Sequence, residues 1–173
     1  MTLYEFEGRR PEVHETSYVS KSAEVIGDVT IGKGCFIAPG AVIKGDYGSI
    51  EIGDNSNVQE NCVVHARPGE KTSIGRWVTL GHAAVVHGAT IHDHAVIGMG
   101  AIVCDDAVIN EWGVVAEGAV VNSGKEVEKE SVVAGVPAKP IKKIDEEYKE
   151  TWMKIKKEYS SFSKRYKEDL TRL

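Results

Sequence analysis

The stretch IGMGAIVCDDAVINEWGVVAEGAVV, from Ile97 to Val121, places an aliphatic residue at every sixth position. The same spacing begins at Val19, and a small residue often follows the aliphatic residue by four positions. A period of six is not helical, and the many Gly, Val and Ile residues also disfavour a helix. The repeated aliphatic positions are Val19, Val25, Ile31, Ile37, Ile43, Ile52, Val58, Val64, Ile74, Leu80, Val86, Ile91, Ile97, Val103, Ile109, Val115 and Val121.

A short strand, a tight turn and an inward-facing aliphatic residue, repeated many times, indicate a parallel β-helix whose coils stack on one another. Each coil buries its aliphatic side chains only when its neighbours cover it. The pattern resembles the hexapeptide-repeat family, which forms a left-handed β-helix with three hexapeptides in each triangular coil. The seventeen repeats then predict between five and six coils.

The repeat is interrupted at three places. The segments KGDYGS, after Ile43, and ARPGEKTS, which begins two residues after Val64, lengthen the six-residue step, and a step of five follows Val86. We expect the two insertions to bulge from the β-helix as loops, where functional residues often lie. After Val121 the period fades.

The last part of the chain has a different pattern. Between Asp145 and Leu170, apolar residues recur at intervals of three and four, with Lys and Glu between them, which predicts an amphipathic helix. We therefore expect an all-β domain over residues 1–140, with a short N-terminal lead-in, and a C-terminal α-helical part over residues 141–173 that packs on the β-helix. The apolar positions of the helix are Tyr148, Trp152, Ile155, Tyr159, Phe162, Tyr166 and Leu170.

Composition excludes several classes of function. The chain has 173 residues, a formal net charge of -5 and a pI near 5.7, which argues against a nucleic-acid-binding protein. No window has the apolar length of a signal peptide or a membrane-spanning helix, so we expect a soluble, cytoplasmic protein with no membrane partner. Three widely spaced cysteines predict reduced thiols rather than a disulfide framework.

The histidines of the stretch LGHAAVVHG and its surroundings can be placed by counting faces. His65 follows Val64 and His87 follows Val86, so the two lie on one face, one coil and roughly 5 Å apart. His82 lies on a different side of the prism and cannot reach the same ion within one chain. A threefold head-to-tail homotrimer would bring His82 of a neighbour to that pair. Three imidazoles and a water form the open tetrahedral arrangement of a catalytic zinc.

The histidine-containing stretch is one of three short motifs by which the chain resembles a known family. With GD at Gly45–Asp46, NVQEN at Asn57–Asn61 and GHAAVVHG at Gly81–Gly88, the chain resembles the γ-class carbonic anhydrases and their relatives, including a group linked to phenylacetate and carnitine pathways. The resemblance implies that His65, His82 and His87 bind a metal at trimer interfaces. Three imidazoles suit Zn²⁺, and Fe²⁺ or Co²⁺ equally.

The resemblance also implies roles for four polar residues. Gln59 and Asn57 would lie beside the metal-bound water, and Asp46 with Lys44 would form an intersubunit salt bridge or act directly in catalysis. The metal would lower the pKa of its water, and the hydroxide would attack carbon dioxide to give bicarbonate.

The chain also departs from the family pattern. Lys44 stands where the family usually has arginine. Lysine keeps the positive charge but lacks the planar guanidinium group that pairs with a carboxylate through two hydrogen bonds. Tyr47 and Pro68 occupy positions where archaeal members have glutamates, one of which shuttles protons. Glu60 and Tyr159 are the candidate replacements. Three alternatives stay open: a metal-dependent acyl-CoA thioesterase, a hexapeptide acyltransferase that uses one histidine and no metal, and an inactive trimeric scaffold.

Overall fold

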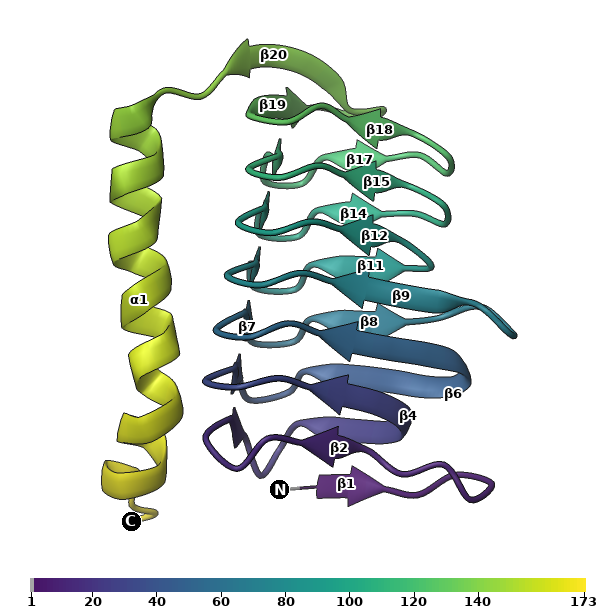
Figure 1. The fold of residues 1–173 in the computed structure, drawn as a ribbon, viewed down its shortest axis with the longest axis vertical. Coiled ribbons are helices and arrows are strands. Elements are labelled where there is room, and N and C mark those ends of the chain that lie inside the picture. Colours follow the sequence, from purple (N-terminus) through teal and green to yellow (C-terminus); the bar gives the residue numbers. More distant parts are fainter. Residues whose placement is uncertain (1) are drawn as a thin grey trace.

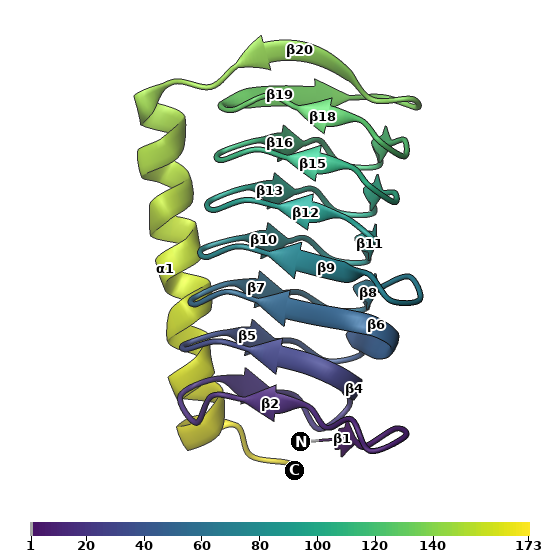
Figure 2. The ribbon, with the colours of Figure 1, turned by 45° about the vertical axis from the view of Figure 1, so that its right-hand side comes forward.

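Parallel pairing between residues one coil apart builds the structure, a computed structural model that describes residues 2–173. Val86, for example, pairs with Val64 of the preceding coil and with Val103 of the next one. Repetition of this pairing stacks triangular coils into a prism, and a C-terminal helix runs along its side (Figures 1 and 2). The predicted all-β fold, a left-handed parallel β-helix with a C-terminal helix, is confirmed.

The prism has three faces. The first, which we call the histidine face, continues around one corner into the second, because β4 and β6 run across both. The histidine face contains β1 (Thr2–Tyr4), β4 (Glu24–Ile31), β6 (Val42–Ile52), β8 (Val63–His65), β11 (Val85–His87), β14 (Ile102–Val103) and β17 (Val120–Val121). The second face adds β2 (Glu12–Val13), β9 (Lys71–Ile74), β12 (Thr90–Ile91), β15 (Val108–Ile109) and β18 (Glu126–Val127).

The third face, which we call the helix face, is a separate sheet. Its last strand, β20, runs antiparallel to β19 and leads the chain to the helix. The face contains β3 (Tyr18–Val19), β5 (Phe36–Ile37), β7 (Asn57–Val58), β10 (Thr79–Leu80), β13 (Val96–Ile97), β16 (Val114–Val115), β19 (Ser131–Ala134) and β20 (Lys139–Lys143).

Two expectations about the repeat are wrong. Residues 2–173 form about seven coils rather than five to six, because Val127 and Val133 continue the six-residue spacing beyond Val121 and pair with Ile109 and Val115. The segment KGDYGS is also not a loop, although it bulges from the pairing with β4, whose register shifts between Gly27 and Val29. It forms the middle of β6, where the extra residues carry one unbroken strand around the corner between two faces.

The core contains the inward-facing residues of every coil. The repeated aliphatic residues from Val19 to Val121 are at most 3% exposed, and the small residues between them, such as Ala84 and Ala101, are fully buried. This tight packing fixes the register of each coil, since a shift of one residue would turn the aliphatic side chains outward. The β-helix is therefore a rigid support for side chains that point out of it.

The helix α1 (Glu146–Asp169) covers the helix face (Figure 1). Asp145 caps its first turn, because its side chain accepts a hydrogen bond from the amide of Tyr148. The sequence placed Ile155 and Leu170 on the packed side, but they are 38% and 62% exposed, whereas Lys156 is fully buried. Within residues 2–173, no helix combines the length and the apolar character needed to cross a membrane.

Candidate functional site

The histidine face brings His65 and His87 together. They end the adjacent strands β8 and β11 and are direct partners in the parallel register. Their ring centroids are 5.1 Å apart, and Nδ1 of His65 lies 3.1 Å from Nε2 of His87. The counting of faces therefore predicted this pair correctly.

The outer nitrogen of each ring contacts a carboxylate. Oδ1 of Asp46 lies 2.8 Å from Nε2 of His65, and Oδ1 of Asp105 lies 2.5 Å from Nδ1 of His87. Because an ionised carboxylate only accepts hydrogen bonds, each ring donates its proton outward and directs a lone pair toward the other ring. Two lone pairs at that distance repel unless a proton or a cation lies near both.

This arrangement fits a divalent metal ion. Two imidazole nitrogens at the usual zinc distance of ~2.0–2.1 Å and a tetrahedral angle lie about 3.3 Å apart, close to the spacing found here. Ligating histidines also commonly donate their second N–H to a carboxylate, which fixes the tautomer and the ring orientation. His65 would then bind through Nδ1 and His87 through Nε2.

Lys44 and Gly45 position Asp46 within β6. Nζ of Lys44 lies 3.1 Å from Oδ2 of Asp46, so this pair lies within one chain. Burial alone would raise the pKa of Asp46, but the hydrogen bonds from His65 and Lys44 outweigh it and lower that pKa. Gly45 lies so close to the backbone of Asp28 in β4 that a Cβ atom would clash with it.

Asp105 is a site residue that was not identified from the sequence. It lies in the turn after β14, and its second oxygen is 3.2 Å from Nε of Arg67. Counting coils leads to its neighbour, because the five-residue step after Val86 places Cys104 one coil beyond His87, and Asp105 is the next residue. Arg67 belongs to the segment ARPGEKTS, whose first residues form a turn between β8 and β9.

His82 lies apart from the pair, in the turn between β10 and β11. Its side chain is 46% exposed, and Nδ1 lies 2.6 Å from Oε2 of Glu60. Oε2 of Glu60 is not aligned for a hydrogen bond with Nδ1 of His82, so the contact is mainly electrostatic. Among residues 2–173, no cluster of three or more potential metal ligands forms.

Asn57 and Gln59 lie on the helix face, in and just after β7, and both are buried. Nε2 of Gln59 donates to Oδ1 of Asn57 over 3.1 Å, and Nδ2 of Asn57 donates to Oγ1 of Thr79 over 3.0 Å. Gln59 and His82 line one cavity of about 180 Å³ beneath α1. Within one chain these amides therefore lie near His82.

The positions that differ from the family pattern lie at the outer edge of the pair. Tyr47 is 61% exposed, and its ring centroid is 6.0 Å from that of His65. Pro68 is exposed in the turn after β8. Neither side chain has the carboxylate that the family pattern places at these two positions.

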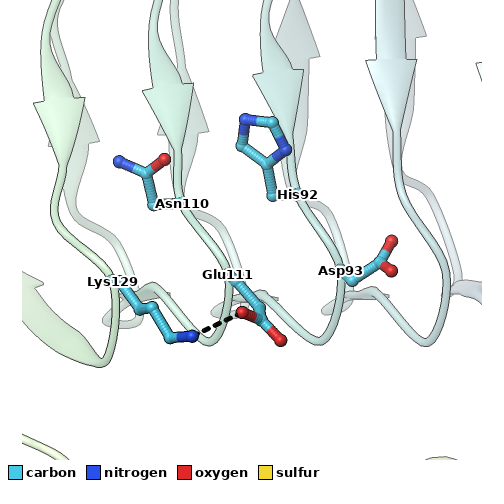
Figure 3. Close-up of a pocket in the computed structure, with 5 residues that line it drawn as sticks. All are labelled: His92, Asp93, Asn110, Glu111 and Lys129. Carbon is cyan, nitrogen blue, oxygen red and sulfur yellow. Dashed lines mark hydrogen bonds and ion pairs between the residues drawn. The ribbon is translucent and has the colours of Figure 1, made fainter.

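A second hollow, of about 490 Å³, lies on the surface of other coils. Figure 3 shows its side chains on successive coils, where only Lys129 and Glu111, 2.7 Å apart, contact one another. His92 is exposed there, and Asp93 pairs with Arg76 outside the hollow. The five side chains do not converge on a common point.

The chain is similar in sequence to two family models and to proteins of known families. The family model described as the GMPPB C-terminal domain matches residues 46–153, and the bacterial transferase hexapeptide (six repeats) model matches residues 10–45. The carnitine operon protein CaiE of Escherichia coli is 36% identical over 147 residues, which cover 85% of this chain and 75% of CaiE.

Two solved structures have the same fold as this chain over nearly its whole length. A hexapeptide transferase family protein from Anaplasma phagocytophilum has a TM-score of 0.91 and 38% identity, covering 95% of this chain and 98% of that one. A protein from Bacillus cereus to which acetyltransferase activity is ascribed has a TM-score of 0.93 and 30% identity, covering 96% of both chains. The chain shares its architecture and much of its sequence with these proteins.

Proposed function

This chain belongs to the hexapeptide-repeat family that includes CaiE and the γ-class carbonic anhydrase-like proteins, and on that premise we propose that it is a homotrimeric metalloenzyme that hydrates carbon dioxide to bicarbonate. The observation that carries the proposal is the pair of imidazole nitrogens, 3.1 Å apart, whose rings are each oriented by a carboxylate. A cation bound between the two nitrogens would relieve the repulsion of their lone pairs.

The metal would be held by His65 and His87 of one subunit and by His82 of the next. A head-to-tail threefold interface sets one face of each subunit against a different face of its neighbour, which matches the different corners that these residues occupy. Zn²⁺ suits three neutral imidazoles, and Fe²⁺ or Co²⁺ would also bind.

When bound, a divalent ion of this kind supplies Lewis acidity that makes water nucleophilic near neutral pH. The chain's own residues supply orientation. Asp46 and Asp105 keep the rings of His65 and His87 in the ligating tautomer, and Lys44 keeps Asp46 ionised. Gln59, beside His82 in the cavity, would orient carbon dioxide or bicarbonate through its amide.

An acyltransferase that uses acyl-CoA is the second candidate. The comparisons support it, because the solved relatives are described as a hexapeptide transferase and an acetyltransferase. In the structure, the contact between His82 and Glu60 supports it as well. A carboxylate at Nδ1 leaves Nε2 of a half-exposed histidine free to act as a general base, with no metal. A metal-dependent acyl-CoA thioesterase would instead use the His65–His87 pair.

One set of measurements separates these functions. The protein is purified without added metal, its metal content and oligomeric mass are determined, and carbon dioxide hydration is measured beside release of free CoA from acyl-CoA. The proposal expects a trimer with about one ion per subunit interface and hydration activity that a chelator abolishes. A metal-free protein that transfers acyl groups would overturn it in favour of the acyltransferase. Chelator-sensitive CoA release without an acceptor would indicate the thioesterase, and a metal-loaded trimer inert in both assays would indicate the scaffold.

A further inference from the structure

Lys156 is enclosed between α1 and the helix face. Its side chain is 0% exposed, and Nζ lies 3.1 Å from the carbonyl oxygen of Ala95 and 3.3 Å from Oγ1 of Thr79. The ring of Trp152 is centred 5.5 Å from the same nitrogen. Among the described residues, no acidic group is near enough to influence its ionisation. Fully buried lysines are rare and are normally paired with an acid, so this unpaired amine calls for a different explanation.

Burial lowers the pKa of Lys156 to about 7, so the amine can both accept and release a proton near neutral pH. The titratable group that faces it from the β-helix is His94, in the turn between β12 and β13. Burial and then the charge of Lys156 lower the pKa of His94 below its ordinary value. Tyr159, the neighbour on α1, has its pKa raised by burial and by Glu60, and it therefore keeps its proton.

Thr79 connects Lys156 to the candidate site. Its Oγ1 faces both Nδ2 of Asn57 and Nζ of Lys156, and the hydroxyl remains free to donate its own hydrogen. Thr79 also lines the cavity of about 180 Å³ that Gln59 and His82 line. Since one water occupies about 30 Å³ of liquid volume, that cavity has room for a short chain of waters.

We propose that Lys156 is the proton acceptor of this site and that it receives, through the hydroxyl of Thr79, the proton that hydration releases. This inference rests on the proposed function. It also assigns a proton acceptor to a chain that has Tyr47 and Pro68 in place of the family's glutamates. That acceptor lies beside the cavity beneath α1 and not in the outer loops.

The proton balance is simple. Carbon dioxide and water give bicarbonate and one proton. A water of the cavity passes that proton to Oγ1 of Thr79 while the hydroxyl hydrogen of Thr79 moves to Nζ of neutral Lys156, which becomes an ammonium ion. The ammonium is stabilised by the carbonyl of Ala95 and the ring of Trp152. After bicarbonate leaves, the proton returns along the same path to a buffer base at the mouth of the cavity.

The experiment compares four zinc-loaded proteins, namely wild type, Lys156→Met, Thr79→Val and Thr79→Ser, in carbon dioxide hydration at low buffer concentration. Lys156→Met preserves the buried volume, and Thr79→Ser is the matched control that keeps the hydroxyl. We expect kcat to fall roughly 10-fold or more in Lys156→Met and Thr79→Val, kcat/KM to remain unchanged, and added imidazole to restore kcat. Thr79→Ser should behave as wild type. Zinc content is measured for all four proteins, and the Nζ titration of Lys156 is followed by NMR in wild type.

Separate results overturn the inference and the proposed function. If wild type is active but Lys156→Met keeps its kcat, if kcat and kcat/KM fall together, or if NMR shows Lys156 charged up to pH 9, the proton-acceptor role is wrong while hydration stands. If zinc-loaded wild type does not hydrate carbon dioxide at all, the proposed function is wrong and the role of Lys156 falls with it. If Lys156→Met does not fold, Thr79→Val and its serine control decide by the same criteria.

Discussion

Asp105 lies one coil beyond His87, and its carboxylate accepts a hydrogen bond from the ring Nδ1 over 2.5 Å. The same carboxylate is held from its other side by Arg67, 3.2 Å away. The orientation of the His87 ring is therefore set by a residue on the next coil. Because the stacked coils are rigid, the His87 side chain is held in one orientation. Asp46 acts on His65 in the same way.

Replacing Asp105 with asparagine is expected to weaken zinc binding about 10- to 100-fold, the usual effect of losing such a partner of a ligating histidine. An amide can donate as well as accept, so the His87 ring is no longer held in one tautomer. Zinc affinity is measured by competition with a chromophoric chelator. Asp106→Asn is the matched control, because Asp106 is exposed and adjacent. Equal affinities in the two variants would contradict a role for Asp105.

The sharing of ligands between subunits predicts complementation. His82→Ala and His65→Ala should each abolish zinc binding and leave the trimer folded, because both side chains lie outside the core. When equal amounts are unfolded and refolded together, three in four trimers are mixed, and each mixed trimer has one complete site of three, so about a quarter of the wild-type zinc content should return. Zinc content of the refolded trimers is the measurement. No recovery, or retention of zinc by either variant alone, would disprove the shared site.

Phe36 is expected to anchor α1 to the β-helix. Its ring is 1% exposed and stacks against Tyr18, while Phe162 and Tyr166 of α1 contact it edge to face. Phe36→Ala should lower the free energy of unfolding by about 3–5 kcal/mol and increase hydrogen exchange in the C-terminal half of α1. Phe6→Ala, at a 41% exposed position, is the control. Unchanged exchange in α1 would show that other contacts hold the helix.

Regular spacing decided how much of the fold could be predicted. Because a period of six fixes which side of the prism each residue occupies, the His65–His87 pair and the separate place of His82 followed from counting. The course of KGDYGS did not follow, since added residues can either leave the sheet as a loop or extend a strand around a corner. Pairing between Gly27 and Gly45 decides for the strand, and the sequence pattern alone does not contain that contact.

The buried lysine shows a second limit. A helical pattern assigns Lys156 to the solvent side and Ile155 to the packed side, by residue type. The structure reverses the two, because the contact line of α1 is set by the strands beneath it, where Thr79 and the carbonyl of Ala95 provide polar partners. Coil counting from His87 leads only to Cys104, the residue before Asp105, because the step after Val86 is one residue short.

The ionisation of Lys156 also predicts how stability depends on pH. Its pKa is about 7 in the folded chain and 10.5 as the ordinary value. Between these values the unfolded chain binds a proton that the folded chain has released, so the free energy of unfolding rises as the pH increases from about 7 toward 10.5. Below pH 7 the burial of the charge destabilises the fold fully.

Lys156→Met removes this dependence, because methionine fills the same space without a charge. The variant should be more stable than wild type by on the order of 4 kcal/mol at pH 6, and the difference should shrink steadily as the pH is raised to 9. Urea denaturation of metal-free protein at pH 6, 7.5 and 9, at one protein concentration, measures it. Lys157→Met, at an exposed neighbouring position, is the control. A stability difference between Lys156→Met and wild type that does not vary with pH would mean that Lys156 keeps its proton in the folded chain.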